Sequence, residues 1–193
     1  VETQPSVSIT LKQRFSRLKR WQRWLVGVLG FCVAWPVVMT VVYAVVPPPV
    51  SNLMVLRLFS GNGIHKQWVP LSKISPHLPR AVITSEDARF CDHNGVDLIE
   101  LQGVVEDAFD DDEGPIRGAS TIPMQLAKNL FLWDGRNPVR KVLEIPIAYW
   151  MDLVLSKRRL IELYLNEVEW APGIYGAEAA AQFHFRKPAA KLS

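Results

Sequence analysis

The chain has 193 residues, of which 49% are apolar. This length and composition allow one ordinary domain with an additional segment and exclude a disordered or collagen-like chain. The formal charge of +3 arises at the N-terminus, where residues 1–23 hold six cations and one acid. The remaining residues hold 16 cations and 18 acids, a slightly acidic balance that argues against a nucleic-acid partner. Cys32 and Cys91 are too few and too differently placed for a disulfide or a zinc site.

Residues 24–46 form an uncharged, apolar stretch that predicts a transmembrane helix. As a helix, this stretch would extend roughly 34 Å, which exceeds a hydrocarbon core of about 30 Å. The basic residues lie just before it, so the positive-inside rule places residues 1–23 in the cytoplasm and residues 47–193 outside. Pro36 is expected to kink this helix midway.

A cleaved signal peptide would have the same orientation and is the main alternative. Its apolar region is about 7–15 residues long, which is shorter than the stretch found here. The length and the flanking charges also argue against a buried core helix. We therefore expect a retained membrane anchor.

After the anchor, residues 47–78 are predicted to form a Pro-rich linker and a small strand region. The apolar run at 53–59 is closed by the Ser-Gly-Asn-Gly sequence at 60–63, a pattern typical of a short strand followed by a turn.

From residue 79 onward the pattern becomes helical. Asp97 has the spacing of a capping box with a glutamate three residues later. Asn137 and Ser156 are expected to be the N-caps of two further helices, and Pro146 is expected to bend or end the first of these two. The sequence therefore predicts a mainly α domain over residues 79–193.

Glu86 is the first candidate for chemistry. It follows the apolar residues 81–83, which could bury it, and a buried carboxylate is a usable general base near neutral pH. The alternative is that Glu86 pairs with Arg89 on a helix surface. Taken alone, this signal is weak.

A second candidate is a dense group of cations, which follows the Gly-Ala-Ser-Thr sequence at 118–121. Cations around a helix N-terminus suit a phosphate or diphosphate, because they supply charge-assisted hydrogen bonds. The alternative is an ordinary i,i+4 ion pair between Arg140 and Glu144, and the residues alone do not separate the two. The cations are Lys128, Arg136, Arg140 and Lys141.

Five short blocks occur in order along residues 79–193. They are Glu86-Asp87-x-x-Phe90-x-x-His93-x-Gly95; Gly118-Ala119-Ser120-Thr121-Ile122 with Gln125, Lys128 and Asn129; Arg140-Lys141-x-x-Glu144; Lys157 to Asn166; and Tyr175 to Lys187. Together they resemble the peptidoglycan glycosyltransferases of glycosyltransferase family 51, in particular the membrane-anchored monofunctional transglycosylases.

This resemblance implies a lysozyme-like glycosyltransferase domain after one N-terminal transmembrane helix. It implies Glu86 as the general base and Glu144 as a supporting carboxylate. Lipid II and a growing lipid-linked glycan would be joined with inversion at the anomeric carbon, and undecaprenyl diphosphate would leave. The implied substrate-binding residues are Ser120, Thr121, Gln125, Lys128, Asn129, Arg136, Arg140 and Lys141.

The resemblance also bears on cofactors and location. The mechanism requires no cofactor, although Mg²⁺ or Mn²⁺ held by Glu144 is left open, and the sequence predicts no metal site of its own. The implied location is a single-pass protein of the bacterial inner membrane with its catalytic domain in the periplasm. Other cell-wall synthesis proteins are left open as partners.

Pro123 and Met124 depart from the family pattern, which has a hydroxyl residue and a glutamine there. Ser120 is the expected N-cap, which places Pro123 in the first helical turn, where its missing N–H breaks no bond. Met124 is expected to face the substrate cleft. Met124→Gln should then raise kcat/KM several-fold, up to about tenfold.

Two other functions stay open. A lysozyme-like glycan-cleaving enzyme needs a protonated acid for its neutral leaving group, and the cations argue against it. A membrane-anchored, non-catalytic partner in a wall-synthesis complex is favoured by the two departures. It is also favoured by a family domain that normally continues beyond Ser193, which leaves a C-terminal truncation open as an interpretation.

Overall fold

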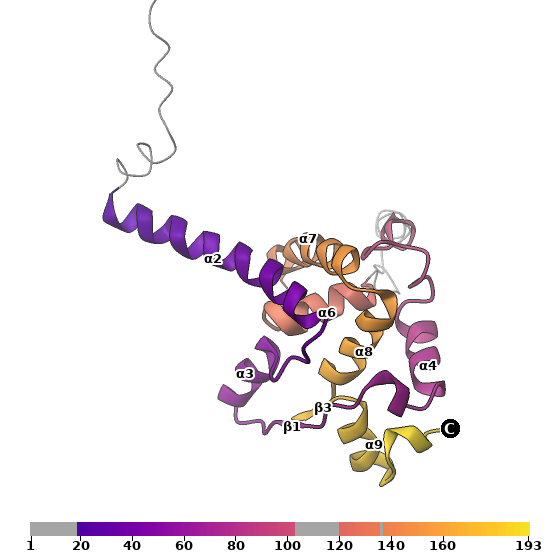
Figure 1. Cartoon of the computed structure of the whole chain (residues 1–193). Coiled ribbons are helices and arrows are strands. Elements are labelled where there is room, and N and C mark those ends of the chain that lie inside the picture. The colour runs from indigo at the N-terminus through magenta and orange to yellow at the C-terminus, as the bar shows by residue number, and fades with distance from the viewer. Residues whose placement is uncertain (1–18, 103–119, 136) are drawn as a thin grey trace, which may run out of the picture. The chain divides into compact units, whose positions relative to one another are not determined.

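The structure, a computed structural model, describes residues 19–102, 120–135 and 137–193. The chain separates into two compact units, Val1–Val38 and Met39–Ser193. Helices dominate the second unit, as predicted (Figure 1). The predicted mainly α class is therefore confirmed.

The helix α2, Arg20–Tyr43, is long and apolar enough to cross a membrane. It begins four residues before the predicted stretch at 24–46 and ends three residues before its end. Pro36 lies inside α2, and the helix continues past it. By length and composition, α2 is a candidate membrane anchor.

The strand predicted at 53–59 is wrong, because this segment forms the helix α3, Asn52–Phe59. The Ser51 side chain accepts a hydrogen bond from the backbone N–H of Met54, which caps the helix N-terminus. Leu53 and Met54 are buried. The side chain of Asn52 donates to the carbonyl of Leu132 at 2.6 Å, which ties α3 to the C-terminal end of the helix α6, Ile122–Phe131.

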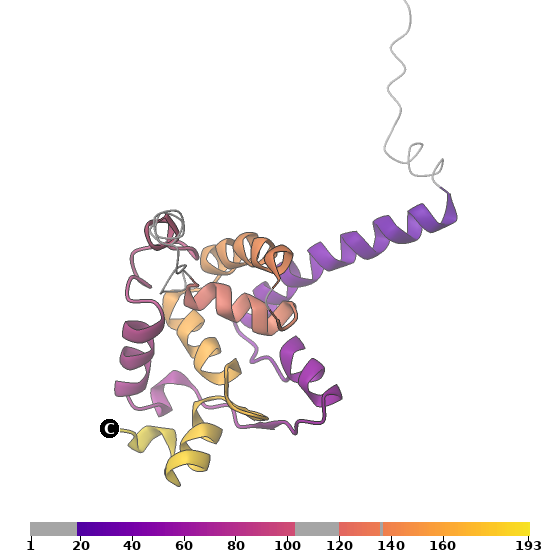
Figure 2. The same ribbon diagram turned by 180° about the vertical axis from the view of Figure 1, so that it is seen from behind.

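The centre of the second unit is the helix α6, Ile122–Phe131, which contacts α3, the helix α7 at Pro138–Val154 and the helix α8 at Lys157–Glu167. Figures 1 and 2 show α6 between α7 and α8 from both sides. Seven of its ten residues are buried, so the packing of α6 dominates the core. The largest buried side chains from the three helices include Ile122, Leu126, Met151, Leu160 and Leu163.

The predicted starts of α7 and α8 are confirmed. The Asn137 side chain accepts from the backbone N–H two residues later, and the Ser156 side chain accepts from the N–H three residues later. Asp97 likewise accepts from two backbone N–H groups, and residues 98–102 are helical. Pro146 does not end α7. Its position is exposed, so the carbonyl that it leaves without a helical partner can bond to water.

The remaining elements of the described residues are a small sheet, which packs against α9 (Ala177–Phe185), and further helices and turns. The strand order is β1-β3-β2, with β1 and β3 parallel and β2 and β3 antiparallel. The elements are β1 at His65–Lys66, the 3-10 turn η1 at Leu71–Lys73, α4 at His77–Glu86, β2 at Glu169–Ala171, β3 at Ile174–Tyr175, α9 at Ala177–Phe185 and η2 at Ala189–Lys191.

Candidate active site

An open cleft of about 660 Å³ lies where α4 ends and α6 begins. Its polar lining includes Glu86, Arg89, Asp97, Glu100, Ser120 and Gln125. The cleft therefore joins residues from the first two sequence blocks. Their proximity is a tertiary effect, since residues 96–117 separate the two blocks along the chain.

Glu86 is the last residue of α4 and is exposed in this cleft. The expected burial of Glu86 is wrong, because the apolar residues before it point into the core on one side of the helix only; Val82 is buried there. The alternative pairing with Arg89 is also wrong. The Arg89 guanidinium lies 3.0 Å from Asp97, and Glu86 Oε2 instead accepts a hydrogen bond from Gln125 Nε2 at 3.0 Å.

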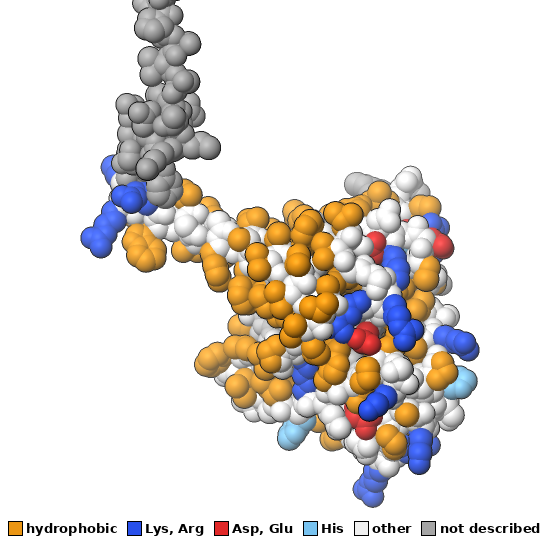
Figure 3. All heavy atoms as spheres, viewed as in Figure 1, with side chains coloured by type: hydrophobic (Ala, Val, Ile, Leu, Met, Phe, Trp, Pro, Cys, Tyr) orange, Lys and Arg blue, Asp and Glu red, His pale blue; other side chains and the backbone are white. Residues whose placement is uncertain are grey.

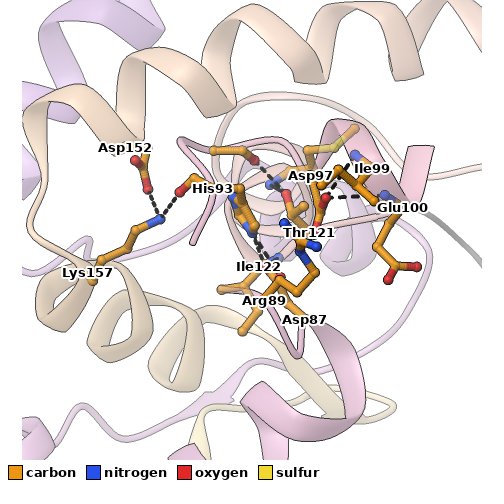
Figure 4. A network of polar contacts seen from close by, with 12 residues as sticks. Asp87, Arg89, His93, Asp97, Ile99, Glu100, Thr121, Ile122, Asp152 and Lys157 are labelled. Carbon is orange, nitrogen blue, oxygen red and sulfur yellow. Dashed lines mark hydrogen bonds and ion pairs between the residues drawn. The ribbon is translucent and has the colours of Figure 1, made fainter. Parts of the chain in front are cut away.

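The next residue, Asp87, is buried and holds the turn after Glu86 in place (Figure 4). Its two carboxylate oxygens lie 2.9 and 3.0 Å from Nε2 of His93. One of them also accepts from the backbone N–H of Ile122 at 2.9 Å. Asp87 thus connects the end of α4 to the N-terminus of α6, where an acceptor satisfies an otherwise unpaired backbone donor.

The loop that carries His93 is held from two sides. Thr121 donates through its hydroxyl to the carbonyl of Gly95 at 2.6 Å. On the other side, Lys157 donates to the carbonyl of His93 and to Asp152, each at 2.6 Å (Figure 4). The hydroxyl of Thr121 is therefore engaged within the protein, where it also caps α6 in place of the expected Ser120. The cap lies one residue later than expected, and Pro123 is in the first turn, as predicted.

A second group of residues surrounds Glu144, which is only 2% exposed. One Glu144 oxygen contacts the Arg140 guanidinium, and the other lies 3.1 Å from Nζ of Lys141. Lys141 also donates to the hydroxyl of Ser120. Because Ser120 lines the cleft, Lys141 joins the cation group to the cleft.

The cations of this group crowd one another. Burial lowers the pKa of Lys128, and the nearby charges of Arg140 and Arg57 lower it further, while Asp134 and Glu169 oppose this. Burial also lowers the pKa of Lys141, with Arg140 and Lys128 acting in the same direction. A bound anion would relieve this mutual repulsion, so the group suits an anionic ligand.

The structure thus divides the predicted site residues. Glu86, Ser120, Thr121 and Gln125 line the cleft, and Lys128, Arg140 and Lys141 belong to the cation group, two of whose members contact Glu144. Asn129 is buried, and Arg136 lies outside the described residues. The ion pair between Arg140 and Glu144 exists, but its carboxylate is buried and shared with Lys141, unlike the simple surface pair considered as the alternative.

Met124 does not face the cleft, and the expectation that it does is wrong. Its side chain is fully buried. It packs in a small apolar cluster with Val96 and Ala148, flanked by Leu101 and Ile145. The helix is held in this rotation by the Thr121 cap and by Asp87, which binds its first N–H.

Met124→Gln is therefore expected to lower the free energy of unfolding by about 1–3 kcal/mol, because the amide would be buried in an apolar cluster whose side chains offer it no hydrogen bonds. Met124→Leu, which keeps the apolar character and the volume, should lose less than about 1.5 kcal/mol. Urea unfolding of both variants measures the difference. An increase in kcat/KM without loss of stability in Met124→Gln would contradict the buried position.

Glu144 was the candidate for holding a divalent ion, and its surroundings do not fit that role. Each of its carboxylate oxygens contacts a cationic side chain. Within residues 19–102, 120–135 and 137–193, no three His, Cys, Asp or Glu side chains come together as metal ligands. Glu144 is better placed to orient Arg140 and Lys141.

An exposed carboxylate lies in an open cleft, and a crowded group of cations contacts the cleft wall at Ser120. This arrangement suits general-base catalysis with an anionic leaving group. The family model described as Transglycosylase matches residues 53–193, and the chain belongs to this family of glycosyltransferase enzymes. Its domain is lysozyme-like, as predicted. The family match begins at residue 53, well before the resemblance recognised from residue 79.

Several relatives share the name biosynthetic peptidoglycan transglycosylase. The Agrobacterium fabrum protein is 57% identical over 145 residues, which are 75% of this chain and 63% of that relative. The Rhodopseudomonas palustris protein is 52% identical over 83% of this chain and 70% of its own length. The Rhizobium johnstonii protein is 46% identical over the whole chain and 78% of its own length. This chain thus spans less than two thirds of the length of the Agrobacterium relative.

Sequence reasoning named no role for Asp87, His93, Lys157 or Tyr164, although all four lie in the quoted blocks. Their membership of the ordered blocks was the one signal in the sequence that could have indicated these four residues. Asp87, Lys157 and Tyr164 contact residues at least 35 positions away, so spacing along the chain did not indicate what they contact, and His93 contacts the buried Asp87 of its own block.

Proposed function

We propose that this protein is a peptidoglycan glycosyltransferase that polymerises lipid II, with Glu86 as the general base. The observation that carries the proposal is that Glu86 lies exposed in a cleft whose wall, at Ser120, is bonded to the cation group by Lys141. Glu86 and the cation group thus border the same cleft. The names of the relatives support the same polymer as the product.

The reaction needs a base because the attacking sugar hydroxyl is a poor nucleophile at neutral pH. Glu86 is accessible to such a hydroxyl, since its side chain is exposed at the cleft. One oxygen is oriented by Gln125. The rigid turn at Asp87 fixes the backbone that carries the base.

The departing diphosphate develops negative charge as the glycosidic bond forms. Lys128, Arg140 and Lys141 can stabilise this charge, since fixed cations need little reorganisation in the transition state. Buried Glu144 holds two of them in place. It therefore acts on the cations, without contacting the reacting atoms.

The second unit carries an apolar surface that suits contact with a lipid bilayer. Hydrophobic side chains gather over α3 and α7 in Figure 3. The exposed ones include Leu58, Phe59, Val139, Val142 and Leu153, the last at 78% exposure. Such a face suits contact with a membrane, and a tether through α2 would concentrate the enzyme on its lipid-anchored substrates.

The test is incubation of the full chain in detergent with lipid II, followed by separation of the products by chain length. Glycan strands with release of undecaprenyl diphosphate are expected. Cleavage of preformed glycan without polymerisation would favour the lysozyme-like alternative. No turnover of either substrate, by a protein that still binds lipid II, would favour a non-catalytic partner.

Lys128→Ala is expected to weaken binding of a diphosphate-bearing lipid II analogue by about tenfold or more, since a hydrogen bond to a charged group contributes about 1.5–3 kcal/mol. Lys191→Ala, which removes an exposed lysine outside the cation group, is the matched control. Calorimetric titration measures both. Equal affinities in the two variants would show that Lys128 is only a surface charge.

A further inference from the structure

Three side chains from three helices form a chain of hydrogen bonds that ends at the proposed base. Tyr164 of α8 donates through its hydroxyl to Oε1 of Gln125 on α6, at 3.0 Å. Nε2 of the same amide donates to Oε2 of Glu86 on α4, also at 3.0 Å. Each bond joins residues 39 positions apart, so only the fold creates the chain.

The amide can serve Glu86 in only one orientation. A carboxylate accepts hydrogen bonds and cannot donate them, so the NH₂ group must face Glu86. The amide oxygen then faces Tyr164, whose hydroxyl supplies the donor that this oxygen needs. Tyr164 is 4% exposed and its backbone lies within α8, so its hydroxyl is held in place. It can therefore fix the side chain of Gln125, which is only half-buried.

We propose that Tyr164 is a positioning residue of the transfer reaction, which fixes the Gln125 amide so that it holds one oxygen of Glu86 and leaves the other to the substrate. The inference rests on the proposed function. In the step concerned, the attacking hydroxyl oxygen bonds to the anomeric carbon while its proton passes to Oε1 of Glu86. The bond from that carbon to the diphosphate breaks, and its electron pair leaves with the diphosphate.

The surroundings of Tyr164 favour a lasting donor. Burial raises the pKa of Tyr164, and the negative charges of Glu86 and Asp87 raise it further, so the phenol keeps its proton at any pH at which the enzyme would work. The other charged groups at the cleft are largely paired. Asp87 pairs with His93, and Asp97 pairs with Arg89, while Glu100 is exposed.

Tyr164→Phe removes only the hydroxyl and releases the amide. We expect kcat on lipid II to fall about five- to tenfold with little change in KM, because the hydroxyl does not contact the substrate. We also expect the acidic limb of the pH profile of kcat/KM to move to higher pH, since a carboxylate that loses a fixed donor is ionised less readily. Gln125→Met should give the same shift, and the double variant should show no further loss.

Tyr175→Phe is the matched control, because Tyr175 is also buried and donates its hydroxyl to a carboxylate, Glu169, at 3.3 Å. It should leave the pH profile unchanged. If Tyr164→Phe lowers the thermal midpoint but keeps the wild-type pH profile, Tyr164 is a structural residue. The inference about Tyr164 then fails, and the proposed function stands. If the wild-type chain does not polymerise lipid II, the proposed function fails and the role of Tyr164 fails with it.

Discussion

Glu86→Gln is expected to reduce polymerisation of lipid II by at least about 100-fold, the usual contribution of general-base catalysis. Glutamine keeps the shape of the side chain but cannot accept the hydroxyl proton. Glu86 is exposed, and its carboxylate accepts a hydrogen bond from the side-chain amide of Gln125. The substitution should therefore leave the free energy of unfolding nearly unchanged. Turnover of lipid II and thermal unfolding, measured on the same preparation, separate the two effects.

Asp92→Asn serves as the control, because Asp92 is an exposed carboxylate close to Glu86 along the chain and lies outside the cleft lining. Its activity should match that of the wild type. Near-normal turnover by Glu86→Gln would remove Glu86 from the mechanism and leave the base to be sought elsewhere in the cleft.

Gly95→Ala is expected to lower the free energy of unfolding by about 3 kcal/mol or more. Gly95 has a φ of +91°, where an L side chain is strained. A Cβ at this position would lie 2.5 Å from the carbonyl oxygen of Ala148, so the backbone of α7 or of the loop must shift, and overpacking of this kind costs about 1–3 kcal/mol. Denaturant unfolding gives the value.

Gly61→Ala separates the two causes. Gly61 also has a positive φ, +85°, but a Cβ there would meet no atom within 4 Å. It should therefore lose only the conformational part, about 1–2 kcal/mol. Equal losses in the two variants would mean that the loop at Gly95 relaxes away from α7 without cost.

The effect of Gly95→Ala should also reach the chemistry. The Gly95 carbonyl accepts from Thr121 at the N-terminus of α6, and Asp87 bonds to the same end of that helix. A displaced loop would move the turn that carries Glu86. We expect the folded fraction of this variant to show reduced kcat as well as reduced stability.

The helix starts could be predicted from sequence because each depends on contacts two or three residues away. Asn137 and Ser156 bond to backbone N–H groups within the first helical turn, and such bonds form wherever the chain enters a helix. The ordered blocks likewise identified the family. They indicated Glu86 and the cations as candidate site residues without any information on where these lie in the fold.

Residues 53–59 could not be assigned correctly in the same way. A short apolar run is compatible with a strand or with a buried helix face, since periodicity cannot separate the two over so few residues. The structure resolves the case through the Ser51 cap and through burial of Leu53 and Met54 against the rest of the unit.

The sequence by itself therefore determined the class of domain, the candidate anchor, the helix caps at Asn137 and Ser156 and the family, because local hydrogen bonds and ordered motifs carry that information. Only the tertiary structure decided that Glu86 is exposed, that Met124 is core and that Tyr164 reaches Glu86 through Gln125. Each of these depends on how a helix is rotated against its neighbours. That rotation follows from packing between segments far apart in the chain, which no local pattern records.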